Sequence, residues 1–182
     1  NTRMGAMHAD AKGISGHQRL SENTNVYLYI EPEQTPIQTG ILDNNSLVEN
    51  KVDAEGKNAC AVWRFADGTK QVNLRYGVSF ISAEQAKKNL EREQKDYNVA
   101  ALAAIGRDVW NKTLARIDVQ GGTEDEKTVL YTSYYRTFER PICMSEDGRY
   151  FSAFDGKVHE DNGVPFYTDD WIWDTYRAAH PL

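Results

Sequence analysis

A tryptophan and an aspartate, Trp173-Asp174, are the adjacent side chains in this sequence best suited to holding a polar ligand. A carboxylate can accept two hydrogen bonds from neighbouring hydroxyl groups, and an indole can cover an apolar surface. On residue types alone, however, the favoured interpretation is a core tryptophan beside an aspartate at a helix start, where the helix dipole stabilises acids. The pair is therefore a candidate binding site only if other residues support it.

Two acidic clusters resemble paired-carboxylate sites, Asp169-Asp170 and Glu124-Asp125-Glu126. Adjacent residues point in different directions on a helix, so adjacent acids rarely form a catalytic pair. The second cluster also fits the first turn of a helix, where acids are stabilising. We interpret both clusters as structural.

The four histidines offer little chemistry. His159 has the side chain of a general acid or base, but a lone histidine beside a turn is more often structural or exposed, and we interpret it so. His180 is expected to make a packing or hydrogen-bond contact. No partner can be named from the sequence for His8 or His17.

Cys60 and Cys143 are far apart in the sequence and have no metal ligands at the close spacing that a zinc site needs. Free cysteines are among the most buried residues, so two buried thiols are the favoured interpretation. A disulfide between them is the alternative, and two residues alone do not decide it.

The composition excludes several classes of function. The 182 residues include 40% hydrophobic and 26% charged residues, as in an ordinary globular protein. The net charge of −6 and the absence of a basic patch make nucleic acid a poor partner. No apolar run is long enough to cross a bilayer, and the first eight residues lack the regions of a signal peptide.

The first part of the chain reads as β-structure. Residues 25–31 are rich in aromatic and β-branched residues and predict a strand. Residues 59–65 lead into Asp67-Gly68, which predicts a hairpin turn. The predicted return strand alternates with period two, which indicates a half-buried antiparallel strand. Its apolar face is expected to comprise Val72, Leu74, Tyr76, Val78 and Phe80.

The period changes at Ser82, where Ser82 and Gln85 have the spacing of a capping box. A charged helix is expected to follow to about Glu93. Another helical pattern extends from about Asp96 to Ile117, with apolar residues at three- and four-residue spacing.

A second capping box, in residues 123–126, predicts a further helix that Pro141 stops. Residues 171–179 are also expected to be helical. The order is thus a sheet, then connecting helices, then helices with loops. This order indicates two domains with a helical connector rather than a βαβ fold.

Six ordered segments of the chain together carry a resemblance to a known family. They include Trp-Asn-Lys-Thr-Leu from Trp110, Asp-Gly-Lys-Val-His from Asp155 and Trp-Asp-Thr-Tyr-Arg-Ala-Ala-His-Pro-Leu from Trp173. The full set is residues 77–90, 110–114, 117–124, 130–137, 155–159 and 173–182. In this order and spacing they resemble the junction between the two domains of glycoside hydrolase family 92, the calcium-dependent exo-α-mannosidases.

The resemblance implies a mixed fold, β then α, in which an antiparallel β-sandwich packs on an (α/α)6 toroid. Family members are several times longer, so the chain is expected to be an internal piece. Residues 1–81 would be part of the N-terminal sandwich, 82–120 a helical linker and 121–182 the start of the toroid. The partners implied are mannose-containing glycans and the remainder of the catalytic domain. The family also implies a periplasmic, cell-surface or secreted location.

The activity implied is removal of terminal α-linked mannose with inversion. One carboxylic acid protonates the leaving oxygen, and a second carboxylate activates a water on the opposite face. Ca²⁺ is expected to hold two sugar hydroxyls in the full-length family enzyme. No position of this chain matches the family's acid, base or calcium ligands. The isolated chain is therefore expected to be inactive.

The resemblance also changes the interpretation of Trp173 and Asp174. In this family, and in other α/α-toroid glycosidases such as trehalases, a Trp-Asp pair lies at the mouth of an early toroid helix. Trp173 and Asp174 are therefore expected to bind substrate. Asp174 should hold sugar hydroxyls rather than carry the catalytic proton.

Two alternatives remain at the level of sequence. A carbohydrate-binding or purely structural β-sandwich without activity would use the strand aromatics Tyr27, Tyr29 and Trp63, although such aromatics usually form core or cross-strand pairs. Another α/α-toroid glycosidase would share the Trp-Asp pair. The Gly-Gly-Thr-Glu segment from Gly121 and the segment from Asp155 argue against it.

Overall fold

A computed structural model describes residues 4–43, 46–49, 51–170 and 172–176 of the chain. The chain divides into two compact units, one formed by Asn1–Tyr97 with Ser145–Val164 and the other by Asn98–Met144 with Pro165–Leu182. Strands dominate the first unit and helices the second, in the order that the sequence predicts. The domain boundaries expected after residues 81 and 120 stay a prediction.

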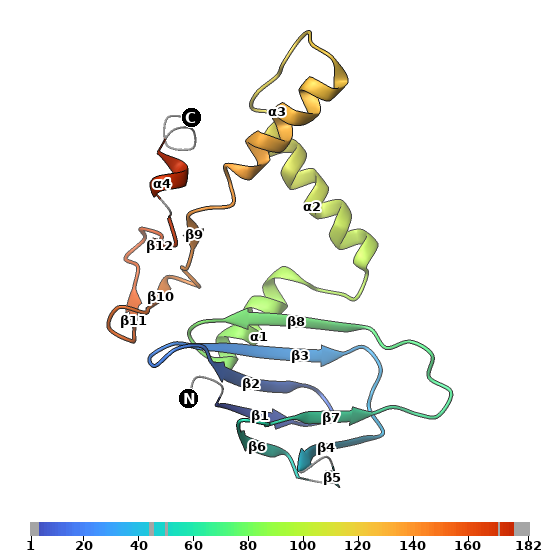
Figure 1. Cartoon of the computed structure of the whole chain (residues 1–182). Coiled ribbons are helices and arrows are strands. Elements are labelled where there is room, and N and C mark those ends of the chain that lie inside the picture. The colour runs from blue at the N-terminus through green and yellow to red at the C-terminus, as the bar shows by residue number, and fades with distance from the viewer. Residues whose placement is uncertain (1–3, 44–45, 50, 171, 177–182) are drawn as a thin grey trace. The chain divides into compact units, whose positions relative to one another are not determined.

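The first unit is built on a five-stranded antiparallel sheet with the strand order β6-β1-β2-β3-β8 (Figure 1). Its strands are β1 (Gly5–Ala9), β2 (Ile14–Arg19), β3 (Asn25–Pro32), β6 (Asp53–Gly56) and β8 (Leu74–Ser79). A three-stranded antiparallel sheet has the order β5-β4-β7 and comprises β4 (Gln38–Asp43), β5 (Ser46–Glu49) and β7 (Ala61–Arg64). The strand predicted over residues 25–31 is confirmed as β3.

The predicted hairpin around Asp67-Gly68 is wrong, although the turn itself exists. The Thr69 amide donates to the Ala66 carbonyl at 3.1 Å, and Gly68 has a φ of 86° that favours glycine. However, β7 pairs with β4, whereas β8 pairs with β3 in the other sheet. Since a two-residue hairpin turn needs strands that meet directly at the turn, the long connection here carries the chain from one sheet to the other.

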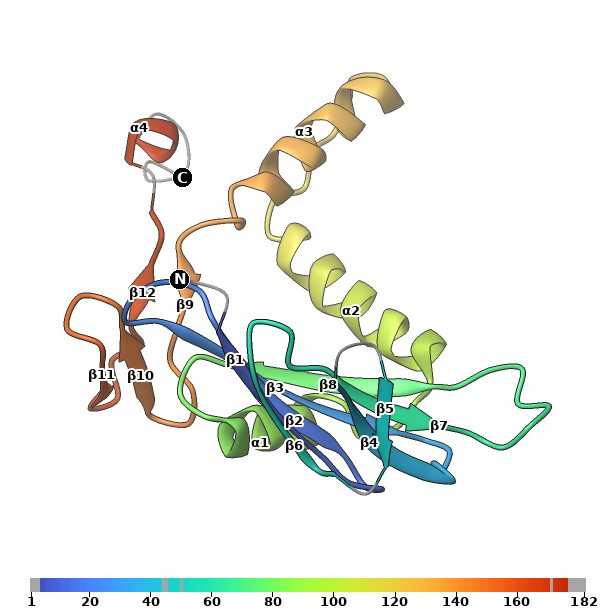
Figure 2. The ribbon, with the colours of Figure 1, turned by 60° about the horizontal axis from the view of Figure 1, so that its bottom comes forward.

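The face of β8 that is buried is the opposite of the predicted one. Leu74, Tyr76 and Val78 are 53%, 58% and 41% exposed. Helix α1 (Ala83–Glu93) packs against the other face of β8 and β3, where Gly77 and Ser79 are buried (Figure 2). Small residues on that face let the helix approach closely, and this tertiary contact overrides the period-two pattern.

The start of α1 confirms half of the predicted capping box. The Ser82 hydroxyl accepts from the Gln85 amide at 3.1 Å, as an N-cap should. The Gln85 side chain does not return to the Ser82 amide. It is buried and donates instead to Asn89 at 3.1 Å and to Asp147 at 2.6 Å.

The contact with Asp147 belongs to a polar network that ties residues 145–164 to α1. Glu146 accepts from the Asn89 amide group at 2.6 Å and from the Phe80 backbone amide at 3.0 Å. Arg149 donates to Gln85 at 2.9 Å, and Arg92 is ion-paired with Asp147. The hairpin of β10 (Arg149–Ser152) and β11 (Lys157–Glu160) follows directly. This network fastens the returning segment to the first unit.

Removing Glu146 should destabilise the first unit. In Glu146→Ala the Phe80 amide and the Asn89 side chain both lose an acceptor, at a cost of about 2–4 kcal/mol. Glu160→Ala is the matched control, because Glu160 is an exposed acid in the same hairpin and its loss should cost less than about 0.5 kcal/mol. Urea unfolding measures both, and equal losses would contradict the role given to the network.

The second unit contains two long helices, α2 (Val99–Leu114) and α3 (Glu124–Arg136). The capping box predicted at the start of α3 is confirmed, with Thr123 and Glu126 bonded in both directions. The helices meet at Trp110, whose ring lies 4.5 Å from that of Tyr135 and 5.9 Å from that of Phe138. Strands β9 (Ile142–Cys143) and β12 (Tyr167–Thr168) pair before the final helix, α4 (Ile172–Thr175).

Candidate functional site

The Trp173-Asp174 pair lies in the single turn of α4. The Thr175 hydroxyl donates to Asp170 at 3.0 Å, which ties the turn to the residues before it. Trp173 is 85% exposed, and its ring lies 6.4 Å from that of Tyr176 at a tilt of 49°. In the described part of the chain the Trp173 side chain is thus exposed rather than buried. The exposed indole can cover an apolar face of a ligand.

Asp174 follows Trp173 in the same turn, but its side chain lies outside what the structure describes. Trp171 and residues 177–182, which include His180 and the rest of the predicted last helix, also lie outside the described residues. The binding role expected for Asp174 therefore stays a prediction.

The carboxylates of the neighbouring acids Asp169 and Asp170 contact other side chains rather than each other. The carboxylate of Asp169 is ion-paired with Arg140, and its carbonyl oxygen accepts from the same guanidinium at 3.2 Å. Asp170 accepts from Thr175. The two carboxylates thus face different partners. This agrees with the structural interpretation of the cluster.

His159 lies on β11, where its Nε2 is 2.9 Å from the carboxylate of Asp155. Its ring stacks on Tyr150 with centroids 5.5 Å apart. Burial raises the pKa of Asp155, but hydrogen bonds from Ser152 and His159 outweigh it and hold that pKa below its ordinary value. The pair braces the hairpin, consistent with a structural histidine.

The three strand aromatics of the alternative carbohydrate-binding sandwich, Tyr27, Tyr29 and Trp63, make separate contacts. The Tyr29 hydroxyl donates to Glu31 at 3.0 Å, and the ring lies under the Lys87 ammonium group at 5.1 Å. The Trp63 indole donates to the Asp10 carbonyl at 2.8 Å. Tyr27 lies on the face of β3 that bears a hollow, described below. The three aromatics do not form one binding groove.

The expectation of buried thiols is wrong, because Cys60 and Cys143 are both exposed and unpaired. Cys60 immediately precedes the short strand β7, and Cys143 ends the two-residue strand β9. At neither position does a described helix or sheet cover the thiol, so the general tendency of cysteine to be buried does not apply.

The described residues contain neither a candidate metal-binding cluster nor a helix that could span a membrane. Across 4–43, 46–49, 51–170 and 172–176, no group of three or more His, Cys, Asp or Glu side chains could hold a metal ion. Among the helices that the structure describes, none is both long and apolar enough to span a membrane.

The structure gives partners to two histidines for which the sequence suggested none. His8 Nδ1 lies 2.8 Å from the carboxylate of Asp53, and the His17 ring lies 5.6 Å from that of Tyr27. Strand alternation places His17 in phase with Ser15 on one face of β2. The cross-strand neighbours depend on the sheet order, which the sequence alone did not give.

Comparison with known proteins identifies the origin of this architecture. The family model described as the glycosyl hydrolase family 92 catalytic domain matches residues 85–182. Comparison with curated proteins finds no match. Among solved structures, the GH92 inverting mannosidase BT2199 from Bacteroides thetaiotaomicron VPI-5482 is 29% identical with a TM-score of 0.82, and the match covers 100% of this chain and 26% of that chain.

Two further structures share the fold. The GH92 α-mannosidase BT3965 from Bacteroides thetaiotaomicron is 22% identical with a TM-score of 0.84, and the match covers 100% of this chain and 26% of that chain. The GH92 glycosyl hydrolase ccman5 is 23% identical with a TM-score of 0.80, and the match covers 94% of this chain and 24% of that chain. The chain thus spans about a quarter of the length of the solved relatives that it matches.

A β-rich unit followed by a helical unit, matched over 94–100% of its length by these enzymes, defines a segment of a glycoside hydrolase. Since the family model matches more than half of the chain, the chain belongs to glycosyl hydrolase family 92.

Proposed function

We propose that the chain is part of an exo-acting, inverting α-mannosidase that removes terminal α-linked mannose from glycans. The observation that carries the proposal is the family match over residues 85–182, together with the 29% identity to an inverting mannosidase along the whole chain. The α-mannosidase BT3965 has also been solved in complex with mannoimidazole, which supports a mannose-shaped ligand for the family fold.

Within this enzyme Trp173 and Asp174 would form part of the subsite for the terminal sugar. The exposed indole of Trp173 would cover an apolar face of the ring. The Asp174 carboxylate would accept hydrogen bonds from two hydroxyl groups and thereby fix the ring's orientation. Both roles position the sugar and leave proton transfer to other residues.

The proton donor, the base and the Ca²⁺ ligands of the proposed reaction would belong to segments outside these 182 residues. An inverting reaction needs two carboxyl groups about 6.5–9.5 Å apart, with a water between one of them and the sugar. The two acids that precede α4, Asp169 and Asp170, are already bonded to Arg140 and Thr175. A periplasmic, cell-surface or secreted location is proposed from the family alone.

The 182-residue chain should therefore release no product from an aryl α-mannoside, with or without added calcium. Its two positioning residues cannot replace a proton donor and a base, each worth about 10²–10⁴-fold in rate. A colorimetric assay against a blank without protein measures the release. Calcium-dependent turnover above the blank would contradict the view that the acid and the base lie elsewhere.

A further inference from the structure

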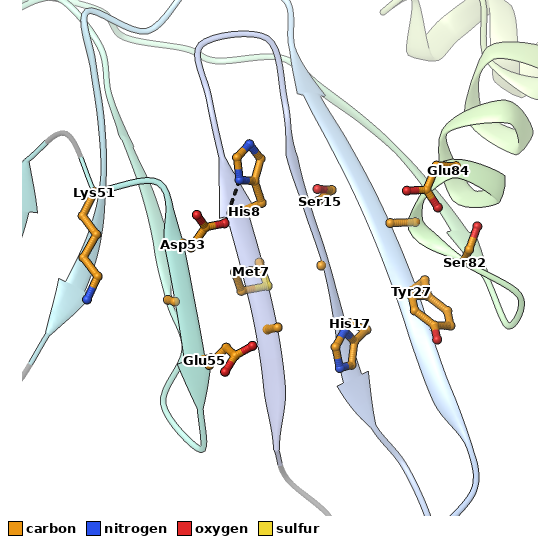
Figure 3. Close-up of a pocket in the computed structure, with 14 residues that line it drawn as sticks. Met7, His8, Ser15, His17, Tyr27, Lys51, Asp53, Glu55, Ser82 and Glu84 are labelled. Carbon is orange, nitrogen blue, oxygen red and sulfur yellow. Dashed lines mark hydrogen bonds and ion pairs between the residues drawn. The ribbon is translucent and has the colours of Figure 1, made fainter.

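One face of the five-stranded sheet carries an open hollow of about 550 Å³ (Figure 3). All of its lining residues belong to the first unit. The size lies within the range of about 300–1,000 Å³ that is usual for small-molecule pockets. Of the lining residues, only Ser82, Ala83 and Glu84 fall in a segment that carries the family resemblance, and none belongs to the Trp173-Asp174 pair.

The hollow follows from side-chain size at the register positions of the sheet. Ala6 is paired with His17, and His8 with Ser15, so small side chains lie between larger ones on the same face. Strand β6 adds Asp53 and Glu55 at one side of the hollow. The first turn of α1, with Ser82 and Glu84, bounds the other side (Figure 3).

The rim carries both donors and acceptors of hydrogen bonds. His8 uses Nδ1 toward Asp53, which leaves its Nε2 for another partner. Asp53 is 73% exposed and has a second carboxylate oxygen to offer. Lys51 adds an ammonium group at the same side of the hollow. A ligand here can both donate and accept.

The lining also provides an aromatic surface. The rings of His17 and Tyr27 lie 5.6 Å apart and are tilted by 49°, so they cannot cover each other's faces completely. Both side chains are half-buried and line the hollow. Such rings can pack against the C–H groups on one face of a ligand.

The charge of the hollow narrows the class of ligand. Asp53, Glu55 and Glu84 face a single lysine, so phosphates and other anions are repelled. Hydrogen bonds from its own backbone amide and from the Ser82 hydroxyl lower the pKa of Glu84, which keeps that carboxylate ionised near neutral pH. A metal ion is disfavoured because the described side chains form no cluster of three ligands.

We propose that this hollow binds a neutral saccharide, with carboxylates of both rims accepting its hydroxyl groups and the Tyr27 ring covering an apolar face of a sugar. Hydroxyl groups that donate and accept, a face of C–H groups and no negative charge are the ligand properties that match this lining. The inference goes beyond the proposed function, because it concerns residues of the sheet and of the first turn of α1 and not the Trp173-Asp174 pair.

The test uses the 182-residue chain carrying Trp173→Ala, which removes the contribution of the exposed indole. Isothermal titration with α-1,2-mannobiose and with cellobiose should reveal binding of at least one of them, with a dissociation constant on the order of 1 mM. Glu55→Ala/Glu84→Ala in that background should weaken this binding at least about tenfold. The matched control, Glu91→Ala/Glu93→Ala, removes two exposed acids of α1 that do not line the hollow and should leave affinity unchanged.

Amide chemical shifts locate the binding and exclude a general effect of the substitutions. The saccharide should shift the amide signals of Ser15, His17 and Glu84, and circular dichroism should show the same fold in all variants. No binding of either saccharide would overturn the proposal. So would equal affinity of the Glu55→Ala/Glu84→Ala variant and the control, or shifts at these amides produced by CaCl₂ but not by either saccharide.

Discussion

Replacing Asp174 by alanine in the longer enzyme proposed above should lower kcat/KM for an aryl α-mannoside by about a thousandfold, or about 4 kcal/mol. The reason is that a carboxylate holding two hydroxyl groups fixes the ring for attack and makes charge-assisted bonds that are strongest at the transition state. Steady-state kinetics measure the effect. The fold should survive, because Asp174 lies in the single turn of α4 and not in a long helix or a sheet.

The neighbouring acid Asp169 provides the matched control. Its carboxylate is ion-paired with Arg140, so Asp169→Ala should change stability slightly and kcat/KM by less than about threefold. If the Asp174→Ala variant kept the activity of the Asp169→Ala variant, the sugar-binding role of Asp174 would have to be abandoned.

Replacing Gly77 by valine should destabilise the first unit more than any other single substitution discussed above. A Cβ at Gly77 would lie 2.1 Å from the Ala86 carbonyl oxygen and 2.9 Å from the Leu90 Cβ. The nearest atom is backbone within α1, so the helix must move away from β8. We expect a loss of at least about 3 kcal/mol, at the upper end of overpacking costs, measured by urea unfolding.

Gly106 in α2 is the control for the loss of a glycine as such. A Cβ there would meet nothing within 4 Å, and alanine is the better helix former. Gly106→Ala should therefore leave stability unchanged or raise it by up to about 1 kcal/mol. A Gly77→Val variant as stable as the native chain would show that α1 does not pack on β8 as described.

Local signals in the sequence predicted the local structure correctly. The aromatic and β-branched run became β3, the Ser82 hydroxyl caps α1, and the capping box of Thr123 and Glu126 is complete. Each of these depends on residues within about one turn or one strand of each other, where propensity and capping dominate.

The errors arose where distant segments decide the outcome. The buried face of β8 is set by α1, which needs the small residues Gly77 and Ser79 more than the apolar stripe. The Gln85 side chain does not complete the capping box, because it donates instead to Asp147, which is 62 residues away in the sequence. Period and motif spacing carry no information about such contacts.

Of the two candidate sites, the sequence suggested the Trp173-Asp174 pair but not the hollow on the sheet. The Trp173-Asp174 pair was singled out through ordered motifs, and its sugar-binding role stays a prediction. The hollow on the sheet was not found, because His8 and Asp53 are 45 residues apart and meet only through the pairing of β1 with β6. A sheet order would have been needed to bring them together.

The most direct test of the central claim is the anomer first released from an α-mannoside, followed by proton NMR in real time. The longer enzyme should release β-mannose first, since an inverting reaction places water on the face opposite the leaving group. Samples of the 182-residue chain under the same conditions should release no mannose. Release of α-mannose first, or failure of the longer enzyme to hydrolyse any α-mannoside in the presence of calcium, would contradict the account.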